Sequence, residues 1–581
     1  MVDRWVADST LSERFPIYTR ANVGEVFPDP VTPLTFGSAL WLAEVGWRDA
    51  WARIGAFSPD EFKPDEFEVL GVVGGYCYLN ASQIRLFGER APGLSWQTMD
   101  AQLLGVQPGI PPYEEQPGDV RPDLTAKIGE TFGWALSLGS VDELTELTED
   151  RILTEEIRAA RPDLSVLDDH ELIDRYGDLM PIHRTLFAHH LFTTFLVTLP
   201  LGIITAVCTA LGKPEAIMTL IAGVGDVDSA APSLALWDLG RMVAHSPTLG
   251  AAFGRGTDGV LEFIREAGGA ESEAFLEAFA QFTYKFGSRG PNEWEARSPT
   301  WETQPELALA AIERMRLSPD SASPSTHQAQ LAEARESLGA ELTEALAGDP
   351  AMQAQFAAAL RSSRAWLPGR ERTKTNNIRL IHECRMTLRE LGARMVERGA
   401  FDEIEDFGFV LWEEVDDLLV DPHKFSGEIR RRKAQYHELA ALEPPFVFAG
   451  EPPAPSTWTR RDAIRPDRLK KGDVMQGVPG CPGVATGRAR VVLDSHDPAA
   501  LEPGDVLVAP ITDPSWTPLF VPAAGVVVDV GAPLSHAVIV SRELGIPCVV
   551  SVTGATQVIP DGALVRVDGN AGTVTMLELP G

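Results

Sequence analysis

Residues 531–548 read Gly-Ala-Pro-Leu-Ser-His-Ala-Val-Ile-Val-Ser-Arg-Glu-Leu-Gly-Ile-Pro-Cys, and this stretch decides the fold of the C-terminal part of the chain. It follows residues 525–530, an apolar run rich in valine that predicts a strand. Ser535 is a good N-cap, which places His536 in the first turn of a helix. Gly545 is the expected C-cap. The stretch therefore predicts a strand, a turn and a helix that begins near a histidine.

The position of His536 suits phosphoryl chemistry. A helix N-terminus presents unpaired backbone N–H groups and partial positive charge, which attract a phosphoryl group. A neutral imidazole there can attack phosphorus and carry the group covalently. From its spacing alone, a single histidine in a first helical turn is more often a residue without chemistry, so the surrounding motif has to decide.

That motif resembles the phosphohistidine mobile domain of the phosphoenolpyruvate-utilising enzymes. The matching positions are Gly531, Ser535, His536, Arg542, Glu543, Gly545, Ile546 and Pro547, whereas Ala532, Val538 and Ser541 depart from the motif by a small side chain each. The resemblance runs from about Gly472 to Thr575 and includes 482–487, 512–514, 516–518 and 567–572. It implies that His536 is the phosphorylated residue and that Ser535, Gly531, Thr512 and Arg542 support its loop.

Composition limits the partners. The chain has 581 residues, which implies several domains, and 44% hydrophobic with 23% charged residues, which is typical of globular proteins. Its formal net charge of -33 argues against nucleic acid or an anionic membrane as partner. Five scattered cysteines without metal-ligand spacing, and an N-terminus without a signal-peptide run, predict a cytoplasmic protein with reduced thiols.

One uncharged stretch, residues 191–212, could be read as a membrane span. Pro200 interrupts it, and no basic cluster flanks it. We therefore predict a pair of buried helices broken at Pro200 and no membrane role. His183, His189 and His190 just before this stretch could suggest metal ligation, but no carboxylate accompanies them at ligand spacing, and no metal site is predicted.

The chain divides into three predicted segments. Residues 1–442 are predicted to be mostly helical, with helices over 329–347, 377–397 and 404–419, and loops at 108–122 and 318–325. Residues 443–469 are rich in proline and are predicted to be a mobile linker. Residues 470–581 are predicted to be a compact α/β domain with His536 on its surface and strands at 488–493, 505–509, 525–530, 548–552 and 564–567. The expected fold is a mostly α acceptor-binding domain followed by a swivelling phosphohistidine domain.

Three segments of the helical part resemble the acceptor domain of this family. They are residues 19–26 with 30–34, residues 286–293 and residues 370–374. In the second, Ser288 replaces the usual histidine. The helical part lacks the strand–helix alternation of the (β/α)8 barrel that binds pyruvate in some members, which argues against pyruvate as acceptor. The layout is similar to the histidine-bearing subunit of phenylphosphate synthase and to rifampin phosphotransferase.

Charged pairs in two of these segments are candidates for phosphoryl or acceptor binding. Arg370 and Lys374 are four residues apart, so they share a helix face and could clamp a transferring phosphoryl group. Arg289 and Glu293 have the same spacing. The alternative for each pair is a solvated helix face or a salt bridge without catalytic role.

The expected activity is a dikinase-type phosphotransfer. The chain has no Gly-x-x-x-x-Gly-Lys-Ser/Thr loop. The resemblance to phenylphosphate synthase, whose nucleotide-binding and histidine-bearing parts lie on separate subunits, implies that a separate ATP-grasp subunit binds ATP and Mg²⁺. That subunit is expected to pass the β-phosphoryl group to His536 and to release AMP and phosphate. A small phenolic hydroxyl is the expected acceptor. Two alternatives remain open: an antibiotic phosphotransferase of the rifamycin type, and a phosphocarrier or regulatory protein that passes nothing to a small molecule.

Overall fold

The computed structural model describes residues 5–104, 110–224, 228, 231–318, 320, 323–463, 468–493, 501–512, 516–531 and 535–580. The chain forms two compact units. Unit 1 comprises Met1–Leu199, Trp294–Ser298 and Gly369–Ile464, and unit 2 comprises Pro200–Glu293, Pro299–Pro368 and Arg465–Gly581. This division differs from the predicted segments 1–442, 443–469 and 470–581, because it groups most of residues 200–368 with the C-terminal domain.

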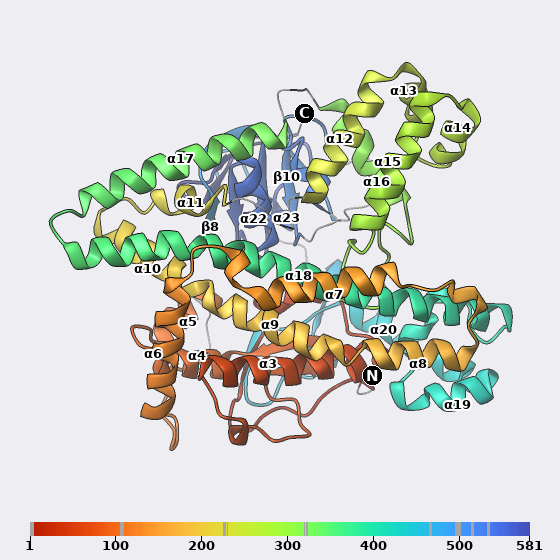
Figure 1. Cartoon of the computed structure of the whole chain (residues 1–581), viewed down its shortest axis with the longest axis horizontal. Coiled ribbons are helices and arrows are strands. Elements are labelled where there is room, and N and C mark those ends of the chain that lie inside the picture. Colours follow the sequence, from red (N-terminus) through yellow and green to blue (C-terminus); the bar gives the residue numbers. More distant parts are fainter. Residues whose placement is uncertain are drawn as a thin grey trace. The chain divides into compact units, whose positions relative to one another are not determined.

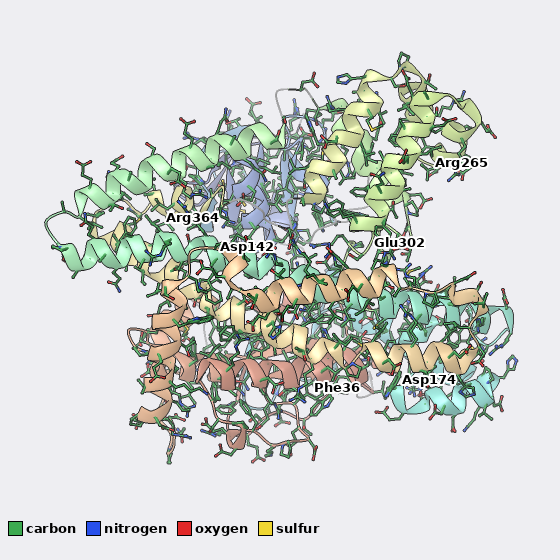
Figure 2. All side chains as sticks on the ribbon, viewed as in Figure 1. Phe36, Asp142, Asp174, Arg265, Glu302 and Arg364 are labelled. Carbon is green, nitrogen blue, oxygen red and sulfur yellow. The ribbon has the colours of Figure 1, made fainter. Side chains whose placement is uncertain are left out.

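Unit 1 is mainly helical (Figure 1). Its helices are α1 (Val23–Val26), α2 (Pro33–Thr35), α3 (Trp41–Ile54), α4 (Ala81–Arg90), α5 (Trp96–Leu103), α6 (Pro122–Ser137), α7 (Thr145–Ala159), α8 (Asp169–Leu179), α9 (Ile182–Leu196), α19 (Val415–Val420) and α20 (Ser426–Ala440). A π-helical turn over Phe36–Leu40 precedes α3. Phe36, labelled in Figure 2, stacks on Phe67 with ring centroids 5.0 Å apart.

The prediction of one helix over 404–419 is wrong. Two 3-10 turns, Ile404–Phe409 and Trp412–Glu414, precede the short α19 there. The Asp406 carboxylate accepts hydrogen bonds from the backbone N–H groups of Asp402 and Glu403. Such local side-chain bonds satisfy the backbone of a turn and compete with a continuous helix.

A small antiparallel sheet in unit 1 was not predicted from the sequence. Its strand order is β2-β3-β1-β5, with β1 at Ile17–Thr19, β2 at Leu70–Val73, β3 at Tyr76–Asn80 and β5 at Val447–Ala449. A second pair joins β4 (Leu442–Glu443) to β6 (Thr459–Arg460). These last three strands lie in or beside the segment predicted as a linker, so that part of the chain is packed into unit 1. The mobility of the linker stays a prediction, and residues 464–467 lie outside the described residues.

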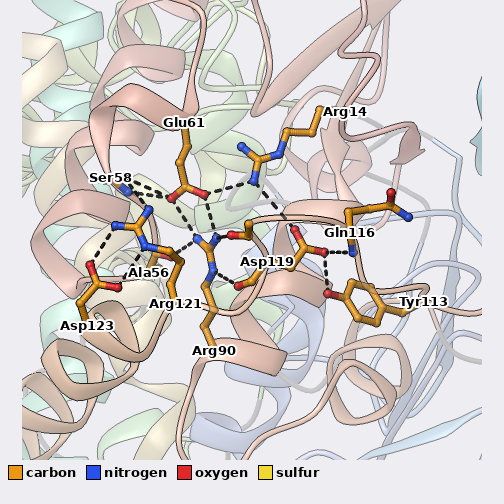
Figure 3. A network of polar contacts seen from close by, with 11 residues as sticks. Arg14, Ala56, Ser58, Glu61, Arg90, Tyr113, Gln116, Asp119, Arg121 and Asp123 are labelled. Carbon is orange, nitrogen blue, oxygen red and sulfur yellow. Dashed lines mark hydrogen bonds and ion pairs between the residues drawn. The ribbon is translucent and has the colours of Figure 1, made fainter.

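A buried arginine connects several turns of unit 1 (Figure 3). Arg90, at the end of α4, forms an ion pair with Glu61 at 2.7 Å. It also donates to the backbone carbonyl groups of Ala56, Gly118 and Asp119. Burial acts to raise the pKa of Glu61, but the hydrogen bonds from Arg90 and Ser58 outweigh it and lower that pKa. The network joins the turn at Glu61 to the loop at Gly118 and Asp119.

Helices α3 and α9 pack closely in unit 1, and Gly46 sits at their contact. A Cβ atom there would lie 2.6 Å from the carbonyl oxygen of Arg184. We expect Gly46→Ala to lower the free energy of unfolding by about 1–2 kcal/mol, because overpacking outweighs the gain in helix propensity of about 1 kcal/mol. Urea denaturation measures the change.

The matched control for Gly46→Ala is Gly177→Ala. Gly177 is an exposed residue of α8, and a Cβ atom there would meet nothing within 4 Å. That variant should be unchanged or stabilised by up to about 1 kcal/mol. A Gly46→Ala protein as stable as Gly177→Ala would show that α3 and α9 do not pack as closely as described.

The helices of unit 2 precede its sheet in the sequence. They are α10 (Thr198–Ala210), α11 (Ala216–Ile221), α12 (Ala231–His245), α13 (Pro247–Phe253), α14 (Val260–Ala267), α15 (Ala270–Phe286), α16 (Glu306–Leu317), α17 (Pro324–Ala345) and the first part of α18 (Pro350–Glu397). The predicted helix break near Pro200 is confirmed, although it falls at Val197, between α9 and α10. Among the described residues one stretch, Asp169–Ala210, meets the length and apolarity of a membrane span, and half of its window is buried.

An eight-stranded sheet forms the centre of the C-terminal domain. Its order is β7-β14-β13-β9-β10-β11-β12-β8. The strands are β7 (Val474–Gln476), β8 (Val478–Cys481), β9 (Val484–Val491), β10 (Val506–Ala509), β11 (Gly525–Val528), β12 (Cys548–Val550), β13 (Leu564–Asp568) and β14 (Thr573–Glu578). Strands β9 to β12 run parallel. All five predicted strands are confirmed, whereas β7, β8 and β14 were missed.

Short helices cover both faces of this sheet. Alternate residues of β10 and β11 enter two separate apolar cores. One core includes residues of α21 (Thr517–Phe520) and α22 (His536–Leu544), and the other includes α23 (Ala555–Val558). Within unit 2, α17 contacts α22, and α12 and α16 contact α21. The helical residues 200–368 therefore pack on the side of the sheet that carries His536.

Candidate functional site

Helix α22 begins at His536, as the sequence predicted. Gly545 ends it in the left-handed conformation, with φ 67°, and its N–H bonds to the carbonyl groups of Ser541 and Arg542. The N-cap prediction for Ser535 is only half confirmed. Its backbone is extended, as an N-cap requires, but its Oγ makes no capping hydrogen bond and is buried without a partner among the described residues. Residues 532–534, which include the predicted turn at Ala532 and Pro533, lie outside the described residues.

The topology of the sheet brings Thr512 to His536. Thr512 follows β10, and α22 follows β11, the parallel neighbour of β10. Because the carboxyl ends of parallel strands meet at one edge of a sheet, residues that follow them lie close together. The imidazole Nδ1 of His536 lies 3.2 Å from Thr512 Oγ1. Asp513 and Pro514 of the same motif lie outside the described residues.

The prediction that His536 lies on the surface is wrong for this structure. Its side chain is 9% exposed. The Phe520 ring meets the imidazole edge-on, with centroids 5.9 Å apart. Thr512 and Phe520 belong to the same domain as His536, so these two contacts lie within the domain itself.

Gly531 and Arg542 shape the loop and the helix rather than adding charge at the imidazole. A Cβ atom on Gly531 would lie 2.8 Å from Val550 Cβ, so a larger residue would displace the turn. The Gly531 carbonyl accepts a hydrogen bond from Ser551 Oγ. Arg542 and Glu543 are buried and form an ion pair at 3.1 Å. The Arg-Glu match of the motif is thus a buried pair in α22.

The Thr512 hydroxyl is a described partner that can fix the imidazole ring. In Thr512→Val the Nδ1 atom loses that partner while the shape of the side chain is kept. We expect formation of phosphohistidine to slow about three- to tenfold, the value of one hydrogen bond of about 0.5–1.5 kcal/mol. Phosphohistidine formation is measured by rapid quench with labelled ATP. Thr512→Ser keeps the hydroxyl and should stay within about twofold of the wild type, and equal rates for both variants would contradict this role.

In unit 1, Arg370 and Lys374 lie on one face of α18, as predicted, and both are partly exposed. Arg370 forms an ion pair with its neighbour Glu371. From α9, His190 Nδ1 lies 3.0 Å from Thr373 Oγ1. Trp294 packs against His183, Phe187 and His190. We call His183, Phe187, His190, Trp294, Arg370, Thr373 and Lys374 the α9–α18 cluster.

Glu295, next to Trp294 of this cluster, contacts the segment 30–34, which resembles part of an acceptor domain. Glu295 accepts hydrogen bonds from Thr32 and Thr35 at 2.8 and 2.7 Å. Arg385 of α18 donates to the backbone carbonyl of Glu295. These buried bonds fix the chain next to Trp294 and thereby the position of its ring.

Arg289 and Glu293 form an ion pair at 2.9 Å in unit 2, and both are 2% exposed. They lie in a turn rather than on a helix, with Asn292 at φ 45°. Ser288, which stands where the family has histidine, is also buried. The pair fits the salt-bridge alternative better than a site for an acceptor, because the two charges already satisfy each other.

The described residues contain no group of three or more His, Cys, Asp or Glu side chains that could hold a metal ion. His189, one of the histidines considered for metal ligation, instead lies 2.7 Å from an Asp150 carboxylate oxygen. The five cysteines form no disulfide.

Two parts of the chain match models of known protein families. Residues 501–572 match the family model "PEP-utilising enzyme, mobile domain", and residues 189–371 match "Rifampicin phosphotransferase fourth domain". The predicted resemblance to the phosphoenolpyruvate-utilising enzymes is therefore confirmed. The second match includes His190 and Arg370 of the α9–α18 cluster.

Curated relatives agree with both matches. The chain is 41% identical to the uncharacterized protein Rv2047c of Mycobacterium tuberculosis over 37% of this chain and 24% of that protein. It is 31% identical to rifampicin phosphotransferase of Streptomyces sviceus over 63% of this chain and 42% of that protein. It is 25% identical to the prodigiosin synthesizing transferase PigC of Serratia marcescens over 98% of this chain and 64% of that protein. The chain thus spans less than two thirds of the length of these relatives.

From the sequence, His190 was considered only as a metal ligand, and Trp294 was not predicted to be a site residue. A signal was present, because His183 and His190 are seven residues apart and thus on one face of a helix. Nothing in the sequence indicated that this face meets α18 beside Arg370.

Proposed function

We propose that this chain carries a phosphoryl group on His536 and transfers it to the hydroxyl group of a small acceptor. The observation that carries the proposal is His536 at the first position of α22, hydrogen-bonded to Thr512, in a domain that matches the mobile domain of the phosphoenolpyruvate-utilising enzymes. Several relatives are named phosphotransferases, which supports the reaction class.

The proposed source of the phosphoryl group is ATP, bound with Mg²⁺ by a separate ATP-grasp subunit. His536 attacks the β-phosphorus, the bond from the β-phosphorus to the α-phosphate oxygen breaks, and AMP leaves, so that a pyrophosphoryl group stays on the imidazole. Water then attacks the γ-phosphorus, the bond from the γ-phosphorus to the bridging oxygen breaks, and inorganic phosphate leaves, so that one phosphoryl group remains on His536. The neutral imidazole supplies the electron pair for the new P–N bond. No Mg²⁺ or ATP ligand is proposed on this chain.

Movement of the phosphohistidine domain is part of the proposal. A side chain that is 9% exposed cannot meet ATP on another subunit, so His536 has to be uncovered before it is phosphorylated. Rotation of residues 470–581 away from α12, α16 and α17, which contact α21 and α22 within unit 2, would open the side of the domain that carries it. Separation of the two half-reactions in this way limits hydrolysis of the intermediate.

The proposed acceptor is a phenolic compound, such as a phenol, an alkylphenol or a hydroxyacetophenone. The rings of Phe187 and Trp294 offer apolar surface for an aromatic acceptor, and Arg370 and Lys374 offer positive charge for the phosphoryl group. A phenolic hydroxyl ionises more readily than an alcohol and is the better nucleophile near neutral pH.

A second candidate, a rifamycin-type acceptor, is favoured by the relatives named rifampicin phosphotransferase. One experiment separates the candidates. The full chain is mixed with candidate ATP-grasp proteins and with ATP labelled at either the β- or the γ-phosphorus, then with phenols or rifampicin. The proposal predicts label on the protein from β-labelled ATP alone, and its transfer to phenols. Transfer to rifampicin only supports the second candidate, and labelled protein without any product supports a phosphocarrier.

A further inference from the structure

The α9–α18 cluster contains a histidine for which the phosphoryl chemistry above has no role. His190 belongs to α9 and is partly exposed. Its ring packs on Trp294 with centroids 5.9 Å apart, and its Nδ1 meets Thr373, which lies between Arg370 and Lys374 on α18. An imidazole therefore lies beside the two cations that are proposed to bind the transferring phosphoryl group.

The hydrogen bonds of Thr373 determine which nitrogen of His190 carries the proton. The Thr373 hydroxyl donates its single proton to the backbone carbonyl of Arg370 at 2.9 Å, because a carbonyl oxygen can only accept. Thr373 Oγ1 must then accept from His190, so Nδ1 is the protonated nitrogen. The other nitrogen, Nε2, keeps its lone pair and makes no hydrogen bond within the described part of the chain.

The surroundings keep this imidazole neutral. Burial, and next the charge of Arg370, lower the pKa of His190 to about 3; Lys374 and His183 act in the same direction, and Glu371 opposes them. Nearby, burial lowers the pKa of His183 to about 4. A phosphoryl dianion beside Arg370 and Lys374 would offset their charge and raise the proton affinity of His190. Its basicity would thus increase when a phosphoryl group is present.

The cluster also holds buried polar atoms that lack partners. Trp294 Nε1 and His183 Nδ1 are buried and make no hydrogen bond within the described residues. Both side chains are less than one tenth exposed. Buried donors or acceptors without a protein partner are costly, and these two atoms can bond to water or to a bound group.

We infer that His190 is the general base that deprotonates the acceptor hydroxyl, on a site formed with Arg370, Lys374 and Trp294. This inference rests on the proposed function. In the step, the acceptor O–H bond breaks and its proton moves to His190 Nε2. The acceptor oxygen forms the new O–P bond, the P–N bond to His536 breaks, and its electron pair returns to the His536 imidazole. His190 then gives its proton to water.

The first test does not depend on the acceptor. The full chain is labelled with ¹⁵N in its histidine rings, and the His190 signal is assigned by its loss in His190→Asn. We expect a neutral ring with the proton on Nδ1 at pH 7. Inorganic phosphate should raise the proton affinity of His190 about tenfold, and the response should be lost in Lys374→Ala. A proton on Nε2, or no response to phosphate in the wild type, would overturn the assignment.

The second test measures a single turnover from phosphorylated protein to phenols of different acidity. In His190→Asn the amide N–H replaces Nδ1–H toward Thr373, but the base is gone. We expect transfer to unactivated phenols to slow by about 10²–10⁴-fold, with loading of His536 unchanged. Nitrophenols already ionised at the assay pH need no base, so their rates should differ less than about threefold. His189→Gln, which changes the neighbouring histidine, is the control and should match the wild type.

The outcomes distinguish the role of His190 as a base from the proposed phosphotransfer to a phenol. A deficit of His190→Asn that is the same for all phenols would mean a positioning role and would overturn the assignment as a base. If the wild type phosphorylates no phenol, the proposed acceptor is wrong, and the ring-nitrogen measurement still decides whether His190 has the predicted proton position and phosphate response. Circular dichroism and thermal melting verify that each variant is folded.

Discussion

His536→Ala is expected to abolish product formation, by at least about 10⁴-fold in the rate of phosphotransfer. The expected loss is complete because the imidazole forms the covalent bond to phosphorus, and alanine offers no nucleophile. The structure requires that the stability of this variant is measured as well. Because His536 is nearly buried against Thr512 and Phe520, the variant also leaves a small cavity. We expect its stability to fall by about 1–2 kcal/mol, which the full chain tolerates.

The measurement is acid-sensitive labelling of the protein with β-labelled ATP, together with product formation. His423→Ala, which removes an exposed histidine of unit 1, is the control and should retain wild-type labelling. A folded His536→Ala protein that still turns over would disprove the assignment. Mass spectrometry during turnover should find one phosphoryl group on the peptide that contains His536.

Lys374→Ala is expected to slow transfer to the acceptor by about 10²–10³-fold, while loading of His536 stays within about twofold of the wild type. The reason is electrostatic. Lys374 and Arg370 lie four residues apart on one face of α18, where two cations can stabilise charge on a phosphoryl group in transit. Loss of one such group in a preorganised site costs about 2.7–4 kcal/mol of transition-state stabilisation.

Loading and transfer are measured separately, by rapid quench with labelled ATP and by a chase of the labelled protein with a phenol. Arg379→Ala is the matched control, because Arg379 lies on the same helix and forms an ion pair with Glu155. That variant should behave as the wild type in both half-reactions. An equal loss in loading and transfer for Lys374→Ala would show that Lys374 has no specific role in transfer to the acceptor.

The C-terminal domain shows what local sequence can predict. Residues 525–528 are valine-rich and buried on both faces, and Ser535 and Gly545 bound the helix between them. Each signal depends on residues close in the chain, so strand, helix and histidine position were all predictable. The strand β8 was missed because Gly and Pro interrupt it. The strands β7, at the sheet edge, and β14, its neighbour, were missed because they are partly exposed.

The α9–α18 cluster shows what local sequence cannot predict. His190 looked like one of several histidines on an apolar helix, and Trp294 like one of 13 tryptophans. Their meeting with Arg370 and Lys374 joins three segments that are far apart in the chain. Side-chain contacts of this kind depend on which helix faces pack together, and periodicity identifies a face but not its partner.

The amino-acid sequence by itself determined the phosphohistidine motif, the strands around it and the shared face of Arg370 and Lys374, since these follow from spacing within one element. Only the tertiary structure decided that His536 is covered, that Arg289 and Glu293 form an ion pair, and that His190 contacts Thr373. Burial and hydrogen-bond partners depend on which segments pack together, and these segments can be as distant in the chain as His190 and Thr373. Burial and partners determine how a histidine can react.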